Sequence, residues 1–197
     1  MITHARTLGL SAIAGAALLA FAGTATATQL TSPAGTVYTG SVHAESSGSI
    51  GYDTPFGPFE CTSGTLAGSI GQHGAGVTVK ATVTAQSFTG CSPSVTVKPL
   101  KGGTMEIHHV AGSNNGTVTS SGYEIELFFN QFGLRCVYSS NNTHVGTLTG
   151  SGVTGGTAVL DIAAALPRTG GTVLCPGQGT WTGQYKITTP DSLLVDA

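Results

Sequence analysis

The chain has little charge. Only 8% of its 197 residues are Asp, Glu, Lys or Arg, and the formal net charge is −2. It has no basic stretch that could bind a nucleic acid or an anionic membrane surface. It also lacks a phosphate-binding G-x-x-x-x-G-K-S/T loop, a dinucleotide fingerprint and a G-x-S-x-G nucleophile elbow. The sequence therefore shows no signature of nucleic-acid binding or of these enzyme classes.

Metal-ligand spacing is absent as well. No two cysteines lie two to four residues apart, as in zinc sites. His108 and His109 are adjacent, so on a strand they would point to opposite faces and could not grip one metal ion. We interpret His109 as a core histidine. His43, His73 and His144 lie in separate segments, and we expect no metal and no other cofactor.

One long apolar run is present, at the N-terminus. Residues 8–22 are apolar and small, and Ala25-Thr26-Ala27 matches a signal-peptidase site. We predict a signal peptide over residues 1–27 and a mature chain over 28–197. An uncleaved anchor is the alternative, although the run is short for a membrane span. With no second run of that length, we expect no stable membrane span after cleavage and a secreted, extracellular or cell-envelope location.

Four cysteines remain in the mature chain, an even number that predicts disulfides in an exported protein. The sequence around them repeats in two units, at about residues 61–91 and 136–175. Each unit contains a similar hexamer, GTLAGS in the first and GTLTGS in the second. Four cysteines allow three pairings, and the repeat favours one bridge per unit, which gives Cys61–Cys91 and Cys136–Cys175.

Alternation of apolar and polar side chains predicts strands in most of the mature chain. The pattern is clear at 77–85, 105–109, 123–129 and 181–187, and Asn115-Gly116 is a strong turn signal. No convincing amphipathic helix is present. We predict a single all-β domain, an antiparallel β-sandwich or flattened barrel built from two disulfide-stapled units.

Aromatic residues provide the candidate contact sites. Two prolines in residues 52–59 argue against a central strand there. The aromatics of this segment are either a contact surface or, for Phe56 and Phe59, a plug under the edge of the sheets. Candidate stacking platforms for a glycan or small ligand are Tyr52, Phe56, Trp181 and Tyr185. Phe128, on the outward face of its strand, is a candidate association surface unless a second sheet covers it.

Three glutamates suggest a hydrolase as another alternative. Glu124 and Glu126 are two residues apart on one strand face, roughly 7 Å between Cα atoms, within the range that inverting glycosidases use. Glu106 would be a third acidic candidate. The competing interpretation is a solvated strand face.

The chain resembles a group of small exported bacterial proteins, of which the best-named members are called protein activators of alkane oxidation. The likeness lies mainly in residues 61–68 (CTSGTLAG) and 88–91 (FTGC), followed by a second cysteine pair before a terminal strand. That group is associated with biofilm matrix and with growth on hydrophobic carbon sources. The resemblance implies an envelope or matrix protein without enzyme activity, and it carries over no catalytic residue.

From these observations we expect a non-enzymatic exported protein that acts at the cell surface or in the extracellular or biofilm matrix. The expected partners are the protein itself, other surface or matrix components, hydrophobic surfaces or glycans. The alternatives are a secreted glycan- or small-ligand-binding module and, less favoured by the sequence, a secreted hydrolase that uses the three glutamates.

Overall fold

The structure, a computed structural model, describes residues 28–71 and 78–196. The predicted signal peptide and His73 lie outside these residues. The described part contains fourteen strands and no helix. The first seven are β1 (Gln29–Thr31), β2 (Gly40–Ser46), β3 (Ile50–Thr54), β4 (Gly57–Ile70), β5 (Val79–Cys91), β6 (Val95–Lys101) and β7 (Thr104–His109). The remainder are β8 (Asn115–Ser121), β9 (Glu124–Phe129), β10 (Leu134–Ser139), β11 (Thr143–Thr149), β12 (Val159–Gly171), β13 (Gln178–Thr189) and β14 (Leu194–Asp196).

The main sheet is antiparallel and closes on itself. Following the pairings gives the ring β2-β4-β5-β7-β8-β11-β12-β13, and β13 pairs again with β2. Closure leaves no free edge in this ring, which is one way that all-β proteins avoid edge-to-edge association. The all-β prediction is confirmed, and the architecture is that of a flattened barrel.

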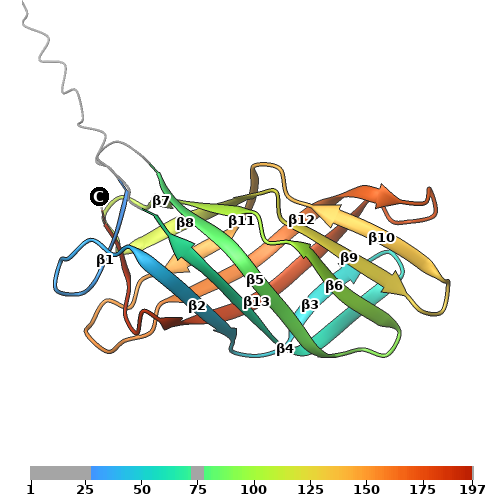
Figure 1. Cartoon of the computed structure of the whole chain (residues 1–197), viewed down its shortest axis with the longest axis horizontal. Helices are drawn as coiled ribbons and strands as arrows, with labels where there is room; N and C mark the ends of the chain where they lie inside the picture. The colour runs from blue at the N-terminus through green and yellow to red at the C-terminus, as the bar shows by residue number, and fades with distance from the viewer. Residues whose placement is uncertain (1–27, 72–77, 197) are drawn as a thin grey trace, which may run out of the picture.

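Four long strands extend beyond this ring into a second half of the molecule. They are β4, β5, β12 and β13, and Figure 1 shows them running along most of its length. In the second half they are joined by the short strands β3, β6, β9 and β10. No ladder joins β5 to β6 in the described strands, so the wall has a seam there.

A small two-stranded sheet covers the other end of the barrel. β1 pairs with β14, and Leu30, Leu193 and Val195 of this region are buried. The backbone of Val195 donates a hydrogen bond to the Asn114 carbonyl at 3.2 Å, which attaches the sheet to the β7–β8 turn. The half of the barrel that the small sheet covers contains β2, β7, β8 and β11, and we call it the plug half. We call the other half the disulfide half.

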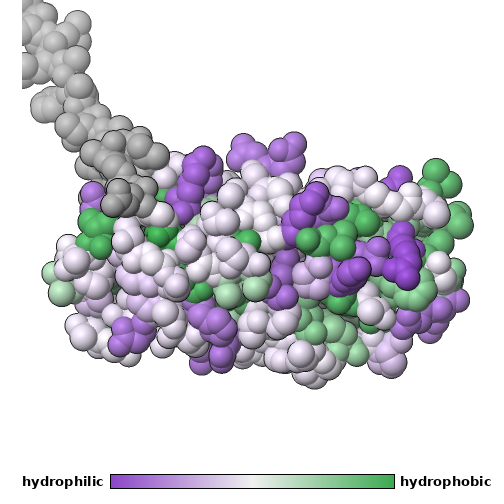
Figure 2. Space-filling model, viewed as in Figure 1, coloured by the Kyte–Doolittle hydropathy of each residue, from purple (hydrophilic) through white to green (hydrophobic). Residues whose placement is uncertain are grey.

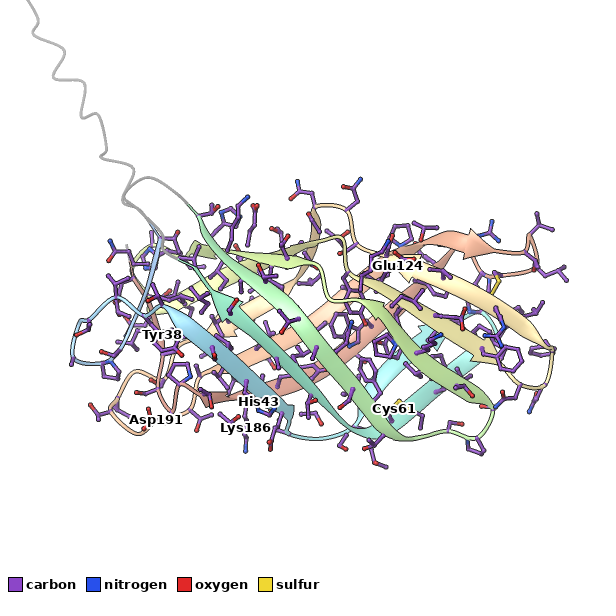
Figure 3. The ribbon with its side chains drawn as sticks, viewed as in Figure 1. Tyr38, His43, Cys61, Glu124, Lys186 and Asp191 are labelled. Carbon is purple, nitrogen blue, oxygen red and sulfur yellow. A yellow bond between two sulfur atoms is a disulfide. The ribbon has the colours of Figure 1, made fainter. Side chains whose placement is uncertain are left out.

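Both predicted disulfides are present. Cys61 and Cys91 face each other across β4 and β5, and Cys136 of β10 bonds to Cys175 beyond the end of β12. Both bridges lie in the disulfide half, and Figure 3 places Cys61 there together with Glu124. The first hexamer shares β4 with Cys61, whereas the second lies on β11, one strand after Cys136. The repeat itself stays a prediction.

Two expectations about local structure were wrong. The segment 52–59 is a β-hairpin rather than a loop, because Pro55 sits in the turn and Pro58 is only the second residue of β4, where a missing N–H is tolerated. The alternation also shifts in β5: a bulge opposite Ala67 and Gly68 turns Ala85 outward.

Glycine permits the bulges in both hexamers. A Cβ atom on Gly68 would lie 2.3 Å from the carbonyl oxygen of Thr82, and one on Gly146 would lie 1.8 Å from that of Asp161. Register shifts occur at both positions. Any side chain there would push the neighbouring strand away, so the repeated glycines are explained by close backbone approach.

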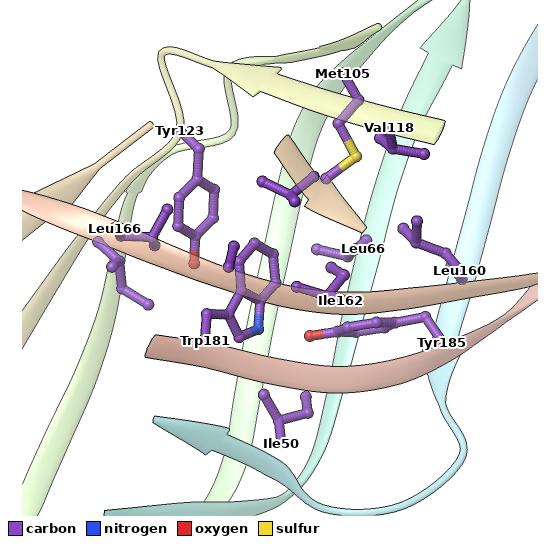
Figure 4. Close-up of a cluster of buried hydrophobic side chains, with 14 of the residues drawn as sticks. Ile50, Leu66, Met105, Val118, Tyr123, Leu160, Ile162, Leu166, Trp181 and Tyr185 are labelled. Carbon is purple, nitrogen blue, oxygen red and sulfur yellow. The ribbon is translucent and has the colours of Figure 1, made fainter. Parts of the chain in front are cut away.

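The two halves have different cores. In the disulfide half the interior is aromatic: Tyr123 stacks on Trp181 at 4.8 Å, and Trp181 stacks on Tyr52 at 6.3 Å. In the plug half it is aliphatic, with residues such as Val118, Leu148, Leu160 and Ile187. Figure 4 shows Trp181 between Tyr123 and Tyr185, with Met105, Val118 and Leu160 further along the barrel.

Candidate functional site

Four hairpin turns meet at the outer end of the disulfide half, which we call the disulfide end. They are residues 55–56, 92–94, 130–133 and 172–177, which join β3 to β4, β5 to β6, β9 to β10 and β12 to β13. None of the four contains Asp, Glu, Lys or Arg. The disulfide end therefore presents turns without charge, and these turns carry large apolar side chains.

The turn between β12 and β13 exposes two adjacent aliphatic residues. Val173 is 91% exposed and Leu174 is 68% exposed, the two highest values among the exposed large hydrophobic side chains. In Figure 2 green surface at the right-hand end of the molecule lies next to purple patches, and smaller green areas are visible elsewhere on this face. Such side chains would be expected to turn inward if the loop were free to rearrange, because burying each stabilises by about 1.5–3 kcal/mol.

The loop is held in place by its own contacts. Cys175 is bonded to Cys136, and the Arg168 guanidinium donates 2.7 Å hydrogen bonds to the carbonyls of Thr172 and Cys175. The Tyr138 hydroxyl donates to the Pro176 carbonyl at 3.3 Å. These contacts fix the two ends of the loop and leave Val173 and Leu174 outside. The exposure is thus a property of a braced loop rather than of a loose one.

Aromatic side chains close the barrel beside this loop. Phe56 and Phe132 come from different hairpins, and their ring centroids are 5.1 Å apart. Phe56 also meets Phe129 edge-on at 5.1 Å, and Phe59 lies below at 6.3 Å from Phe129. Phe56 is 41% exposed and Phe132 57% exposed, while Phe59 is buried. Both interpretations of this segment hold in part, because Phe59 is buried at this end of the barrel and Phe56 contributes to the surface.

Searches against protein-family models, curated proteins and solved structures find no match for this chain. The functional argument therefore depends on the residues themselves. The two disulfides indicate an oxidising environment. Within the described part of the chain, no helix has the length and apolar character needed to cross a bilayer.

Three of the predicted contact residues are in the core. Tyr52 is 2% exposed, and Trp181 and Tyr185 are fully buried. Their prediction as glycan-stacking platforms was wrong, because β3 and β13 turn this face into the barrel, where the rings stack on one another. Burial raises the pKa of Tyr52, and the adjacent Tyr123 hydroxyl at 3.0 Å adds to the rise.

Phe128 does lie on the outer surface. It is half-buried, and the Arg135 guanidinium sits 4.7 Å from the centre of its ring. Arg135 also donates a 2.7 Å hydrogen bond to Glu126. Among residues 28–71 and 78–196 no second sheet covers this outward face of β9 and β10, and Arg135 already occupies one side of the ring.

Each of the three glutamates proposed for hydrolysis forms an ion pair with a lysine or an arginine. The oxygen–nitrogen distances are 2.7 Å for Glu106 with Lys80, 2.6 Å for Glu124 with Lys101 and 2.7 Å for Glu126 with Arg135. Hydrogen bonding from Lys80 lowers the pKa of Glu106, the opposite of the change that a general acid requires. The arrangement matches the solvated strand face that the sequence left as the competing interpretation.

Histidines do not converge in the described residues. His109 Nε2–H donates a 2.7 Å hydrogen bond to the Ser113 carbonyl, because a carbonyl oxygen can only accept. In residues 28–71 and 78–196, no three His, Cys, Asp or Glu side chains are grouped so as to hold a metal ion. His43 lies beside Thr188, at 2.9 Å.

Sequence reasoning missed Val173, Leu174 and Phe132. Val173 and Leu174 precede Cys175 in a segment with no two-residue alternation, so periodicity gives no indication of their exposure. Other turns between strands, such as residues 102–103 and 110–114, are uncharged as well, so absence of charge in the sequence does not single out the turns of the disulfide end.

Proposed function

We propose that the protein is exported and acts without catalysis at the cell surface or in the extracellular or biofilm matrix, where the disulfide end contacts hydrophobic interfaces. The observation that carries this proposal is the exposure of Val173 and Leu174 on a braced, uncharged loop. Phe56 and Phe132 extend the apolar surface on neighbouring turns. Exposed apolar groups that are fixed in place contact an interface without the cost of ordering a loop.

The expected energy is large enough to measure. Burying Val173 and Leu174 in an apolar phase stabilises the contact by about 3 kcal/mol or more. Replacing both by serine should therefore weaken adsorption by about a hundredfold or more. The serine variant keeps the disulfide and the Arg168 hydrogen bonds, because these involve backbone carbonyls and Cys175.

The test is adsorption of residues 28–197 to a hexadecane–water interface, followed by pendant-drop tensiometry. Val173→Ser with Leu174→Ser is compared with Val153→Ser, which removes a 64% exposed valine from the β11–β12 loop in the plug half. We expect the double variant to adsorb at far higher concentrations and the control to match the native protein. Equal adsorption by all three would overturn the assignment to the disulfide end.

The location is tested separately. The producing culture is fractionated into medium, matrix and envelope after growth on a sugar and on a long-chain alkane, and the protein is followed by immunoblot. Enrichment in matrix or envelope is expected. Protein found only free in the medium under both conditions would contradict a surface or matrix role.

A further inference from the structure

The interior of the plug half is incompletely filled. Two cavities of about 60 Å³ each lie between its strands. They adjoin, because both are lined by the same five residues: Val42, Ala81, Met105, Leu160 and Ile187. One cavity extends to Leu30 and Leu193 beneath the small sheet, and the other reaches Gly68 and Val83 near the middle of the barrel. The two cavities therefore lie side by side along the barrel, with shared lining residues between them.

The chemistry of this space is aliphatic. The lining contains Val, Leu, Ile, Ala and Met, and the few hydroxyl-bearing residues, such as Ser69 and Thr82, contribute almost no polar surface. No charged residue lines either cavity. Apolar cavities of this kind stay free of water and take up apolar molecules. Nothing in the lining would hold a carboxylate or a phosphate.

The shape selects a slender molecule. A compact cavity of about 150 Å³ holds a benzene ring. Each of these two cavities is smaller than that volume. Because they share five lining residues and lie next to each other, an extended chain could occupy both. Met105 borders both cavities, and an unbranched thioether side chain with three rotatable bonds adapts readily to an occupant.

The wall beside the cavities offers access. Val42, Ala81 and Val83 point inward but are only partly buried. β5 is paired with β7 only from Val79 to Thr82, and beyond that point begins the seam between β5 and β6. Where the seam begins, the Val83 backbone donates a 3.0 Å hydrogen bond to the Gly103 carbonyl, and further along Gln86 Nε2 donates a 3.1 Å hydrogen bond to the Lys101 carbonyl. A chain that passed here would have to break this one backbone hydrogen bond, but no ladder between two strands.

We propose that the plug half binds one unbranched aliphatic chain, which occupies the two cavities while Met105 moves to join them. The chain is either a free hydrocarbon or the acyl tail of a lipid whose polar head remains outside. This binding site is internal and separate from the disulfide end, so the inference goes beyond the proposed function.

The first experiment measures binding against chain length. Partition of n-hexane, n-heptane and n-octane between headspace and a solution of residues 28–197 gives their affinities, and hexanoate and octanoate are tested by equilibrium dialysis. We expect the affinity of the alkanes to rise about fourfold per added methylene, the factor that corresponds to 0.8 kcal/mol. Octanoate as tight as n-octane would identify an acyl tail, and weaker octanoate a free hydrocarbon.

Methyl NMR locates the ligand. Met1 belongs to the predicted signal peptide, so Met105 supplies the one methionine methyl resonance of the mature chain. We expect this resonance to shift on adding n-octane, with saturation at the concentration that the partition assay gives. An unshifted Met105 resonance at saturating n-octane would overturn the placement of the ligand.

Variants on one strand separate the cavity from the rest of β5. Ala81→Leu fills the space that both cavities share, and it is expected to weaken n-octane binding more than tenfold. Ala81→Val should have an intermediate effect, which also guards against a misfolded leucine variant. The matched control is Ala85→Leu, since Ala85 is exposed on the outward face of the same strand. Native affinity in Ala81→Leu, or no dependence on chain length, would refute the proposal.

Discussion

Alkaline pH should unfold this protein steeply, because three tyrosines of the core cannot ionise while it is folded. Burial raises the pKa of Tyr52, Tyr123 and Tyr185 above the usual value of 10.0. Trp181 beside Tyr185 partly offsets that rise, although their polar atoms do not meet as a hydrogen bond. In the unfolded chain all three would ionise near pH 10. The stability they provide is therefore complete below pH 10 and is lost as the pH rises toward their folded pKa values.

The size of the effect follows from proton linkage. Above pH 10 the unfolded state binds fewer protons than the folded state, so the free energy of unfolding falls with pH. For three groups that stay protonated when folded, the loss is about 3 kcal/mol from pH 10 to 11 and about 4 kcal/mol more to pH 12. A total stability of about 5–15 kcal/mol is typical of a domain, so much of it is consumed within two pH units.

Urea unfolding at several pH values between 8 and 11.5 measures this slope. Tyr185→Phe should reduce it by about one third, since one of the three groups is removed. Its hydroxyl has no hydrogen-bond partner among the described residues, so this variant should fold well at neutral pH. Absorbance at 295 nm in the folded protein supplies the direct check. Full ionisation of all five tyrosines near pH 10 without unfolding would refute the reasoning.

Further predictions concern stability. Replacing Cys136 and Cys175 by alanine should cost about 4 kcal/mol by the loop-entropy argument and abolish adsorption by the disulfide end, as measured by denaturant unfolding and tensiometry. Gly68→Ala should destabilise by about 2 kcal/mol or more, because its Cβ would meet a backbone oxygen at 2.3 Å, whereas Gly48→Ala, with nothing within 4 Å, should be tolerated. Glu106→Gln should change thermal stability by less than about 1 kcal/mol, because its ion pair is at the surface; a larger loss would contradict a solvated strand face.

The sequence predicts the strands better than it predicts the inside of the barrel. Alternation in residues 123–129 correctly puts Tyr123, Ile125, Leu127 and Phe129 on one face. Alternation cannot say which face is interior, because that depends on pairings between distant strands. Trp181 illustrates the difficulty: its face is buried only because β13 pairs with β12 on one side and with β2 and β3 on the other.

Closure of the ring also lies beyond local patterns. Two pairings of β2, one with β4 and one with β13, complete the ring. The strands β2 and β4 are separated in the sequence by β3 and its turns. The disulfide pairing was accessible because the sequence repeat supplied long-range information that periodicity lacks. The exposed loop was missed, since Val173 and Leu174 lie in a segment without the two-residue alternation from which exposure is predicted.

The long strands explain how one barrel can have two kinds of interior. Along β13 the inward residues change from Trp181 and Tyr185 to Ile187, and along β5 they change from Val79 to Phe88. Aromatic packing and both disulfides make the disulfide half a cross-linked body, with a smaller pocket of about 40 Å³ at its end, and cross-linking is what a fixed apolar surface requires. The aliphatic half lacks these features and retains cavities. Ala81 and Leu174 lie in opposite halves without shared partners, so substitutions at the two positions should act additively, and interfacial contact and internal binding can each be removed without the other.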